Sequence, residues 1–449
     1  MIAQRLLELR ERVGHRGALR WREEAWTYGQ LADAIGRLAG SLGKMRGRRV
    51  GVIVADVPRQ LVTLAALDAV GAVAVLYAAS TRADVLVQSR RELQLCELLS
   101  DLPDLDEPLS RYLAAGGGEV TGPDSAAEGR LVLFTSGTSG RPKPAVHTWR
   151  SLAAAVRQED RFADRCWMLT YEPSKFAALQ VILQALLTGG RLAVPEKFTP
   201  QAAACCLVEQ QVEFASGTPT FWRMLLQAGR GEQLCAAPLE QITLGGEAVD
   251  QPVLDALRAV FPRARISHVY ASTEMGTCFS VTDGKAGFPR DYLQDASLPC
   301  RLRIAEDGEL LIQSRRAMTG YLDTEAGDAA WFHSGDLVQE RADRVVFIGR
   351  KSDAINVGGS KVHPLEVEQV IRTVNGVREV RVYGLSSSLV GQLVAADVQP
   401  DPDSDPQDLH ARILKTCRQQ LAKYKVPARI QMLDLPPTAV SGKLSRLSE

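Results

Sequence analysis

Short apolar segments alternate with longer amphipathic segments between residues 26 and 270. The apolar segments have the length of buried β-strands, and the segments between them place apolar residues at helical spacing. This alternation is typical of a mostly parallel sheet covered by helices on both faces. It predicts strands at 49–55, 72–76, 131–134, 165–169, 191–194, 241–244 and 266–270, and helices at 26–42, 61–70, 151–162, 175–187, 198–209 and 251–260.

The pattern changes after residue 300, where short alternating segments replace the helices. Strands at 301–304, 309–312, 338–340 and 345–348 predict a small β subdomain. After Gly349 the sequence indicates a compact α+β unit, with a hairpin at 354–362, helices at 364–375 and 406–421, and strands at 377–384, 393–398 and 430–433. The chain is therefore predicted to be an α/β protein with an N-terminal domain, 1–349, and a small C-terminal domain, 350–449.

The composition is that of an ordinary globular protein. The formal net charge is +0, so nothing in it favours nucleic acid or an anionic membrane as a bulk partner. No apolar stretch has the length of a membrane span, and the first residues lack the apolar run of a signal peptide. The eight cysteines are scattered without a Cys-x-x-Cys pair, which predicts reduced thiols in a cytoplasmic protein.

A loop of small hydroxylated residues follows the strand at 131–134 and ends in a lysine. Its glycines let the backbone approach a ligand closely, and its hydroxyls stand beside N–H groups that can bind an anion. The spacing differs from a Walker loop, because Lys143 stands between Pro142 and Pro144, where no helix can begin. The loop predicts a phosphate site, with a plain Ser/Gly turn as the alternative, formed by Thr135, Ser136, Gly137, Thr138, Ser139, Gly140 and Lys143.

Two further loops follow predicted strands, and ligands of parallel sheets bind beyond the carboxyl ends of strands. If phosphates occupy the first loop, Glu274 in Tyr-Ala-Ser-Thr-Glu is a suitable Mg²⁺ ligand, because Mg²⁺ combines one or two carboxylates with phosphate oxygens. The Gly-Gly-Glu sequence at 245–247 can form a backbone wall against a base. Taken alone, Glu274 reads as a surface or N-cap acid, and the second loop as a strand-to-helix turn.

Three more motifs lie towards the C-terminus. Asp336, in Phe-His-Ser-Gly-Asp, could accept hydrogen bonds from ribose hydroxyls, although an aspartate after glycine is commonly a turn residue. Gly-Arg-Lys-Ser-Asp at 349–353 precedes a glycine-containing hairpin at 356–364. Near the end, Ser-Gly-Lys at 441–443 would by itself be read as a solvated loop.

The order and content of these six motifs resemble the adenylate-forming superfamily of acyl-CoA synthetases, peptide-synthetase adenylation domains and luciferases. The resemblance extends from about residue 26 to residue 446. It implies that the chain uses ATP and Mg²⁺ to convert a carboxylic acid into an acyl-adenylate, releases pyrophosphate, and passes the acyl group to a thiol.

The resemblance also implies roles for individual residues. Residues 135–143 would hold the β- and γ-phosphates, and Thr273 and Glu274 would bind phosphate and Mg²⁺. Asp336, with Arg350 beside it, would bind the ribose, and Lys443 would act in the adenylation step. The adenine side of the site would be formed by Gly245, Gly246, Glu247, Tyr270, Ala271 and Ser272.

In the family the small C-terminal domain is mobile and rotates after adenylation. Lys443 then leaves the site, and the loop with Gly358, Gly359 and Lys361 lines the channel for the thiol. A hinge at Ser352 and Asp353 is compatible with such a motion. The chain departs from the family pattern at three positions: proline and alanine replace glycine at Pro144 and Ala271, and serine replaces the usual Asp or Lys at Ser352.

The resemblance leaves the acid open. It places the acyl pocket at Tyr171, Glu172, Lys175, Phe176, Gly217 and Thr218, and it favours a non-amino aryl or medium-length acyl acid over an amino acid.

The acceptor and the enzyme class have alternatives as well. Coenzyme A is the expected thiol, and the alternative is the phosphopantetheine arm of a separate carrier protein. An inactive nucleotide-binding relative is less favoured because Lys443, Glu274 and Asp336 are retained, and an ADP-releasing kinase is disfavoured by the loop spacing. A monomer or homodimer is expected.

Overall fold

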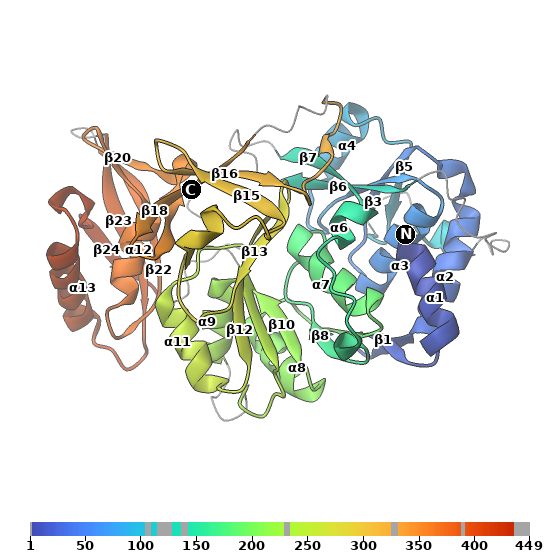
Figure 1. The fold of residues 1–449 in the computed structure, drawn as a ribbon, viewed down its shortest axis with the longest axis horizontal. Coiled ribbons are helices and arrows are strands. Elements are labelled where there is room, and N and C mark those ends of the chain that lie inside the picture. Colours follow the sequence, from blue (N-terminus) through green and yellow to red (C-terminus); the bar gives the residue numbers. More distant parts are fainter. Residues whose placement is uncertain are drawn as a thin grey trace.

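The computed structural model describes residues 2–103, 109–114, 128–135, 142–228, 234–324, 331–387 and 391–434. Its described part contains two large sheets, a smaller antiparallel sheet and a C-terminal sheet. Figure 1 shows the C-terminal unit at the opposite end of the molecule from helix α1 (Ile2–Val13). The observed fold confirms the predicted α/β class with a small C-terminal α+β unit.

The eight-stranded sheet has the order β13-β12-β11-β10-β8-β9-β1-β2. Its pairings from β12 across to β1 are parallel, and the two outer pairs are antiparallel hairpins. The strands are β1 (Gly17–Trp21), β2 (Glu24–Thr27), β8 (Cys166–Met168), β9 (Arg191–Val194), β10 (Phe214–Gly217), β11 (Gln241–Gly245), β12 (Arg265–Ser272) and β13 (Gly276–Val281).

The six-stranded sheet has the order β17-β7-β6-β4-β3-β5. Strands β3 to β6 pair in parallel, whereas β6 and β7 form an antiparallel hairpin. The loop after β6 and the loops after β11 and β12 therefore belong to different sheets. The strands are β3 (Arg49–Ile53), β4 (Val73–Leu76), β5 (Glu97–Ser100), β6 (Arg130–Thr135), β7 (Lys143–Thr148) and β17 (Gly320–Tyr321).

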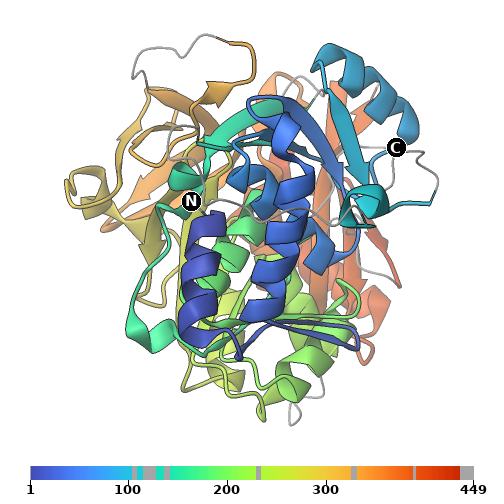
Figure 2. The ribbon, with the colours of Figure 1, turned by 90° about the vertical axis from the view of Figure 1, so that its right-hand side faces the viewer.

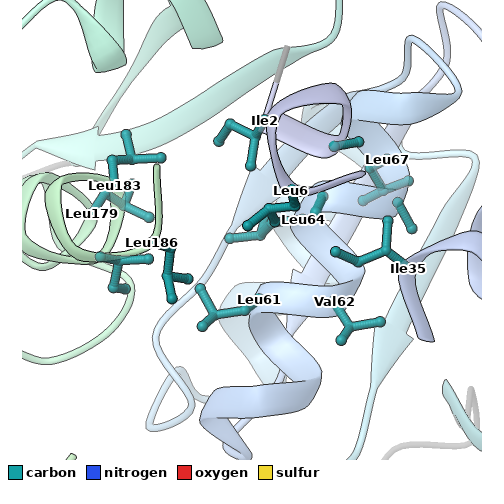
Figure 3. Close-up of a cluster of buried hydrophobic side chains, with 14 of the residues drawn as sticks. Ile2, Leu6, Ile35, Leu61, Val62, Leu64, Leu67, Leu179, Leu183 and Leu186 are labelled. Carbon is teal, nitrogen blue, oxygen red and sulfur yellow. The ribbon is translucent and has the colours of Figure 1, made fainter. Parts of the chain in front are cut away.

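Helices cover these two sheets, and the largest apolar core lies beneath them. Helix α2 (Tyr28–Ser41) begins after a capping box in which Thr27 and Gln30 bond to each other's backbone. Helices α1 and α2 lie side by side in Figure 2. Figure 3 shows their apolar side chains facing those of α3 (Val57–Ala69) and α7 (Phe176–Leu187).

The remaining helices of the N-terminal part are shorter. They are α4 (Ala83–Glu92), α5 (Leu109–Ala114), α6 (Trp149–Ala153), α8 (Pro200–Glu209), α9 (Pro219–Ala228) and α11 (Gln251–Val260). None of the helices in the described ranges combines the length and the apolar character needed to cross a membrane.

The predicted helix at 151–162 was wrong. Helix α6 ends at Ala153, and only a single 3-10 turn follows, at Asp160–Phe162. The side chain of Gln184 on α7 accepts a hydrogen bond from Arg157 N at 2.9 Å and donates one to Arg157 O at 3.0 Å. A neighbouring helix thus satisfies backbone groups that a longer α6 would have paired internally.

The antiparallel subdomain matches the predicted strand pattern. It has the order β14-β19-β18-β16-β15 and consists of β14 (Phe288–Pro289), β15 (Cys300–Ile304), β16 (Glu309–Ser314), β18 (Phe332–Arg341) and β19 (Arg344–Arg350). The C-terminal unit has its own apolar core. Its elements are β20 (Ile355–Val357), β21 (Ser360–Val362), α12 (Pro364–Arg372), β22 (Val377–Ser387), β23 (Gly391–Pro400), α13 (Pro406–Gln420) and β24 (Arg429–Met432).

One buried histidine predicts how stability depends on pH. Burial lowers the pKa of His268 below its ordinary 6.5, although its hydrogen bond to Lys285 O at 3.0 Å opposes this shift. Below pH 6.5 the imidazole of His268 therefore binds a proton more readily in the unfolded chain than in the folded protein. The free energy of unfolding falls as the pH drops below 6.5. His268→Gln keeps an N–H donor but does not titrate, so it should reduce this dependence in urea unfolding measured at several pH values. Burial also lowers the pKa of His147, which should account for part of the dependence that remains. The exposed control, His15→Gln, should leave the dependence unchanged; a wild-type slope in His268→Gln would contradict the prediction.

Candidate nucleotide and acid site

Adjacent parallel strands of the eight-stranded sheet end beside one another and carry several predicted site residues. Gly217 at the end of β10 pairs with Leu244 of β11. A Cβ atom on Gly217 would lie 2.4 Å from the ring of Phe221, so a larger residue does not fit there. Thr218 begins α9 by accepting a hydrogen bond from Phe221 N at 3.0 Å. The backbone at Gly246 has a φ of 82°, which favours glycine in this turn.

The carboxylate of Glu247 faces the start of α9. Its Oε2 accepts hydrogen bonds from Thr220 N at 3.1 Å and from Thr220 Oγ1 at 2.7 Å. An anion at this position is stabilised by the unpaired N–H groups and the dipole of the helix. Glu247 thus ties the Gly-Gly-Glu turn at 245–247 to the start of α9. The contact of this turn with a base stays a prediction.

Two predicted residues from distant motifs, Tyr270 and Arg350, converge on the carboxylate of a third, Asp336. Tyr270 on β12 donates from its hydroxyl to Asp336 Oδ2 at 2.6 Å, and Arg350 on β19 donates from Nε to Asp336 Oδ1 at 2.6 Å. Burial, followed by the charge of Asp336, raises the pKa of Tyr270 well above its ordinary value, so the phenol remains a donor. Its ring is already packed, lying parallel to Phe279 and Phe347 with centroids 5.3 and 5.2 Å away.

Thr273 and Glu274 lie in the tight turn between β12 and β13. Gly276 closes the turn with a φ of 66°, and a Cβ atom there would lie 2.5 Å from Arg316 O. Ser272 accepts a hydrogen bond from Met275 N at 3.1 Å. Ala271 lies inside β12, in extended conformation, where alanine replaces glycine without steric penalty.

The ends of the predicted phosphate loop are well defined. Thr135 ends β6, Lys143 begins β7, and the two residues pair across the hairpin, so no helix follows the lysine, as expected. Pro144 lies in β7, where it accepts a hydrogen bond through its carbonyl from Leu322 N at 2.8 Å. The loop residues Ser136, Gly137, Thr138, Ser139 and Gly140, and the predicted catalytic Lys443, lie outside the described residues.

The predicted acyl-pocket residues divide into two groups. Tyr171 is half-buried, and its hydroxyl lies 3.1 Å from Ser216 Oγ, next to Gly217; burial raises the pKa of the phenol, which stays neutral. Phe176 is buried at the start of α7. Glu172 is instead engaged by its own turn, since it accepts hydrogen bonds from Ser174 N and Ser174 Oγ. Lys175 is exposed at the helix cap.

The predicted thiol-channel residues lie on the β20–β21 hairpin. Gly358 and Gly359 form its turn, with φ values of 56° and 86°, and the exposed Lys361 pairs with Asn356. The hinge residues Ser352 and Asp353 lie in a single 3-10 turn, in which Ser352 Oγ donates to Asp353 Oδ1 at 2.7 Å.

Glu309 on β16 connects Lys351, which precedes the predicted hinge, with the part of β18 that carries Asp336, and sequence reasoning missed it. Its buried carboxylate accepts hydrogen bonds from Lys351 Nζ at 2.6 Å, Gly335 N at 2.8 Å and His333 Nδ1 at 2.9 Å. Burial alone raises the pKa of Glu309, but the hydrogen bonds outweigh burial and hold the pKa below its ordinary range. Lys351 also contacts Asp307 at 2.5 Å, so the residue before Ser352 is anchored on the β subdomain. A single acid at the start of a strand gives no sequence signal for this role.

Sequence comparison identifies the family. The profile of AMP-binding enzymes matches residues 8–322, and that of the AMP-binding enzyme C-terminal domain matches residues 366–443. The chain belongs to the AMP-binding enzyme family. This membership confirms the resemblance inferred from the six motifs.

Relatives of this AMP-binding enzyme align over nearly its whole length. Two 2-succinylbenzoate–CoA ligases, one from Bacillus cereus and one from Bacillus pumilus, are each 26% identical, with 96% of this chain and 94% of the relative aligned. ATP-bound MatB from Rhodopseudomonas palustris has a TM-score of 0.82 at 22% identity, covering 99% of this chain and 97% of MatB. The o-succinylbenzoate CoA synthetase (MenE) of Bacillus subtilis, in complex with its acyl-adenylate intermediate, has a TM-score of 0.77 at 20% identity, covering 98% and 96%.

The donor groups of the site fit a magnesium-bound nucleotide. Among the described residues, the Glu274 carboxylate is contacted by one hydroxyl, that of Tyr321 at 3.5 Å, which leaves oxygen positions for a hard cation. In the ranges that the structure describes, no group of three or more His, Cys, Asp or Glu side chains could hold a metal by itself. A magnesium ion at Glu274 would therefore take its other ligands from phosphate oxygens and water, as Mg²⁺ commonly does.

Proposed function

We propose that this AMP-binding enzyme is an AMP-forming acid–CoA ligase that acts on a non-amino carboxylic acid. The observation that carries the proposal is the convergence of Tyr270 and Arg350 on the Asp336 carboxylate, beside the turn that holds Glu274. The full-length relatives that are named for CoA ligation support the same reaction.

The first half-reaction joins two anions. A carboxylate oxygen of the acid attacks the α-phosphorus of ATP, a new O–P bond forms, and the bond to the β-phosphate breaks to release pyrophosphate. Asp336, held by Tyr270 and Arg350, would orient the ribose. Thr135 and Lys143, which pair across the β6–β7 hairpin, would bind the β- and γ-phosphates. Mg²⁺ bound at Glu274 would supply positive charge to the phosphates. The positive Lys443 ammonium would stabilise the negative charge that develops in the transition state.

The second half-reaction needs no covalent enzyme nucleophile. The thiol of CoA loses its proton to water, its sulfur attacks the acyl carbonyl carbon, the thioester C–S bond forms, and AMP leaves with the electrons of the acyl C–O bond. We propose domains at 1–349 and 350–449, with a hinge at Ser352 and Asp353. Rotation about this hinge would bring Gly358, Gly359 and Lys361 to the site. The anchoring of Lys351 on Asp307 and Glu309 supports a pivot immediately after it.

The pocket residues favour an acid without an α-amine. Glu172, the one carboxylate among the predicted pocket residues, already accepts hydrogen bonds from Ser174 N and Ser174 Oγ. Tyr171 and Ser216 offer neutral hydroxyls, and Phe176 offers an aromatic face. An aryl or medium-length acyl acid with a polar substituent fits these groups best. Loading of a carrier-protein phosphopantetheine arm is the second candidate.

ATP–pyrophosphate exchange over a panel of acids tests the proposal. We expect exchange with aryl or acyl acids and little with amino acids, followed by release of AMP rather than ADP when CoA is added without a carrier protein. Release that requires a carrier protein would favour the second candidate. Tight ATP binding without exchange for any acid would contradict both candidates and support an inactive nucleotide-binding relative.

A further inference from the structure

The residues predicted to hold one triphosphate are divided between two sheets. Thr135 and Lys143 belong to the β6–β7 hairpin of the six-stranded sheet, whereas Thr273 and Glu274 lie in a turn of the eight-stranded sheet. A single Mg·ATP can contact both groups only if the two sheets are held in a fixed relation. The contacts that cross from one sheet to the other therefore decide the geometry of the phosphate site.

His147 on β7 makes the first of these contacts. Its side chain is fully buried, and its Nε2 lies 2.7 Å from the carbonyl oxygen of Thr273. Because a carbonyl can only accept, Nε2 carries the proton that bonds Thr273, and Nδ1 lies within hydrogen-bond distance of Ser151 Oγ, at 3.0 Å. The ring centroid lies 5.8 Å from that of Phe176. Packing and two hydrogen bonds therefore leave the imidazole one orientation.

The segment 318–322 makes the second contact, because its backbone bonds both to β7 of the six-stranded sheet and to the β12–β13 turn of the eight-stranded sheet. Thr319 N and Leu322 N donate to the β7 carbonyls of Val146 and Pro144, each at 2.8 Å. In the same segment Met318 N donates to Glu274 O at 2.8 Å. The backbone of this segment therefore joins the strand that begins with Lys143 to the turn that carries Glu274.

Tyr321 is the side chain of this segment that reaches the predicted ligands. Its hydroxyl lies 3.5 Å from Glu274 Oε1, and the Lys143 ammonium lies 5.5 Å from its ring centroid. A phenol hydrogen bond orients a carboxylate, and the aromatic face attracts a cation. One side chain thus contacts both the predicted metal ligand and the predicted phosphate lysine.

We propose that His147 and Tyr321 are positioning residues for Mg·ATP. His147 acts through the Thr273 carbonyl, and Tyr321 acts through the Glu274 carboxylate and the Lys143 ammonium. The inference deepens the proposed function and rests on it, because it assigns these two side chains to the nucleotide side of the same site. Neither residue belongs to the motifs by which the site was predicted.

Paired substitutions test His147. His147→Leu removes the donor, and we expect it to weaken Mg·ATP binding in calorimetry and to slow pyrophosphate exchange, each by about tenfold or more, because small displacements of reacting groups are costly. His147→Gln retains an N–H that can reach the Thr273 carbonyl, and it should restore most of both. Thioester formation from supplied acyl-adenylate should stay within about twofold of wild type in both variants, because that step does not use the triphosphate.

A second pair tests Tyr321 without disturbing the fold. Tyr321→Phe keeps the ring beside Lys143 but loses the hydroxyl, so it should raise the Mg²⁺ concentration needed for half-maximal ATP binding by about three- to tenfold, the effect of one charge-assisted hydrogen bond. Tyr292→Phe is the matched control, because it also loses one hydroxyl, bonded at 3.1 Å to Ser280 O at the far end of β13 from Glu274, and it should change nothing.

Two results would overturn the inference. The first is wild-type affinity for Mg·ATP in both His147→Leu and Tyr321→Phe. The second is an equal loss of both half-reactions with no rescue by His147→Gln, which indicates a general structural role. Absence of exchange in the wild-type protein itself would instead refute the proposed function, and the calorimetric comparison would still decide the role of the two residues.

Discussion

Arg372→Leu is expected to lower the free energy of unfolding by about 3 to 5 kcal/mol. This is the usual effect of removing one partner of a buried ion pair while the other stays buried and charged. The Arg372 side chain is 6% exposed, and its guanidinium lies 3.0 Å from Glu379, 3.7 Å from Asp250 and 3.8 Å from Glu368. These three carboxylates are themselves 1%, 8% and 0% exposed. Without the arginine, three negative charges would remain close together and out of contact with water.

The ionisation of this cluster agrees with that expectation. Burial alone lowers the pKa of Arg372, but Glu379, Glu368 and Asp250 together raise it above its ordinary value. Burial likewise tends to raise the pKa of Glu379, and Arg223 and Arg372 overcome it, so that the pKa is lowered. Arg372 and Glu379 therefore both favour their charged forms, and each stabilises the charge of the other.

Urea unfolding of the wild-type and Arg372→Leu proteins measures the loss. Arg290→Leu is the control, because the pair of Arg290 with Glu340 is exposed and should contribute less than about 1 kcal/mol. Hydrogen exchange should locate the loss at α12 and β22. A change in Arg372→Leu no larger than that in Arg290→Leu would show that the cluster does not stabilise the fold.

The same cluster joins the C-terminal unit to the rest of the chain. Arg223 on α9 donates to Glu379 of β22 at 3.0 Å and to Asp250, before α11, at 3.2 Å. If the C-terminal unit moves away, Arg223 keeps Asp250, and Arg372 keeps Glu379. Only the cross pairs between the two parts are lost. Each half of the cluster can therefore stay paired in a rotated arrangement, which makes buried charge compatible with the proposed domain motion.

Local patterns predicted the elements well where local forces decide them. Helix α11 and strand β9 have the predicted bounds, because Asp250 caps the first and a continuous apolar run forms the second. The strands of the β subdomain and the C-terminal unit were also predicted. The helix at 151–162 failed because Gln184, on a separate helix, bonds the backbone of Arg157.

The site shows the same division between local signals and long-range contacts. Tyr270, Asp336 and Arg350 each lie in a short motif, and the family resemblance assigned them together to the nucleotide site; the structure brings their side chains into contact. His147 could not, because its partner Thr273 is 126 residues away and on another sheet. Strand patterns indicate that a segment joins a sheet but not which sheet, so the division of the phosphate residues between two sheets became visible only in three dimensions.

Lys443→Ala is expected to reduce the rate of acyl-adenylate formation by about 100-fold or more. This is the usual effect of losing one positive group that stabilises negative charge in the transition state. The prediction rests on the family resemblance and on the match of the C-terminal domain profile through residue 443. Thioester formation from supplied acyl-adenylate should survive, because the proposed rotation removes the lysine from the site before CoA reacts.

The two half-reactions must be measured separately to test this split. Pyrophosphate exchange reports the first, and thioester formation from synthetic acyl-adenylate reports the second. Lys415→Ala is the control, because it removes an exposed lysine of α13 in the same domain and should leave both rates unchanged. An equal fall of both rates in Lys443→Ala would mean that the lysine serves both steps from one position. The C-terminal domain would then have no reason to rotate between them, and the hinge at Ser352 would lose its proposed role.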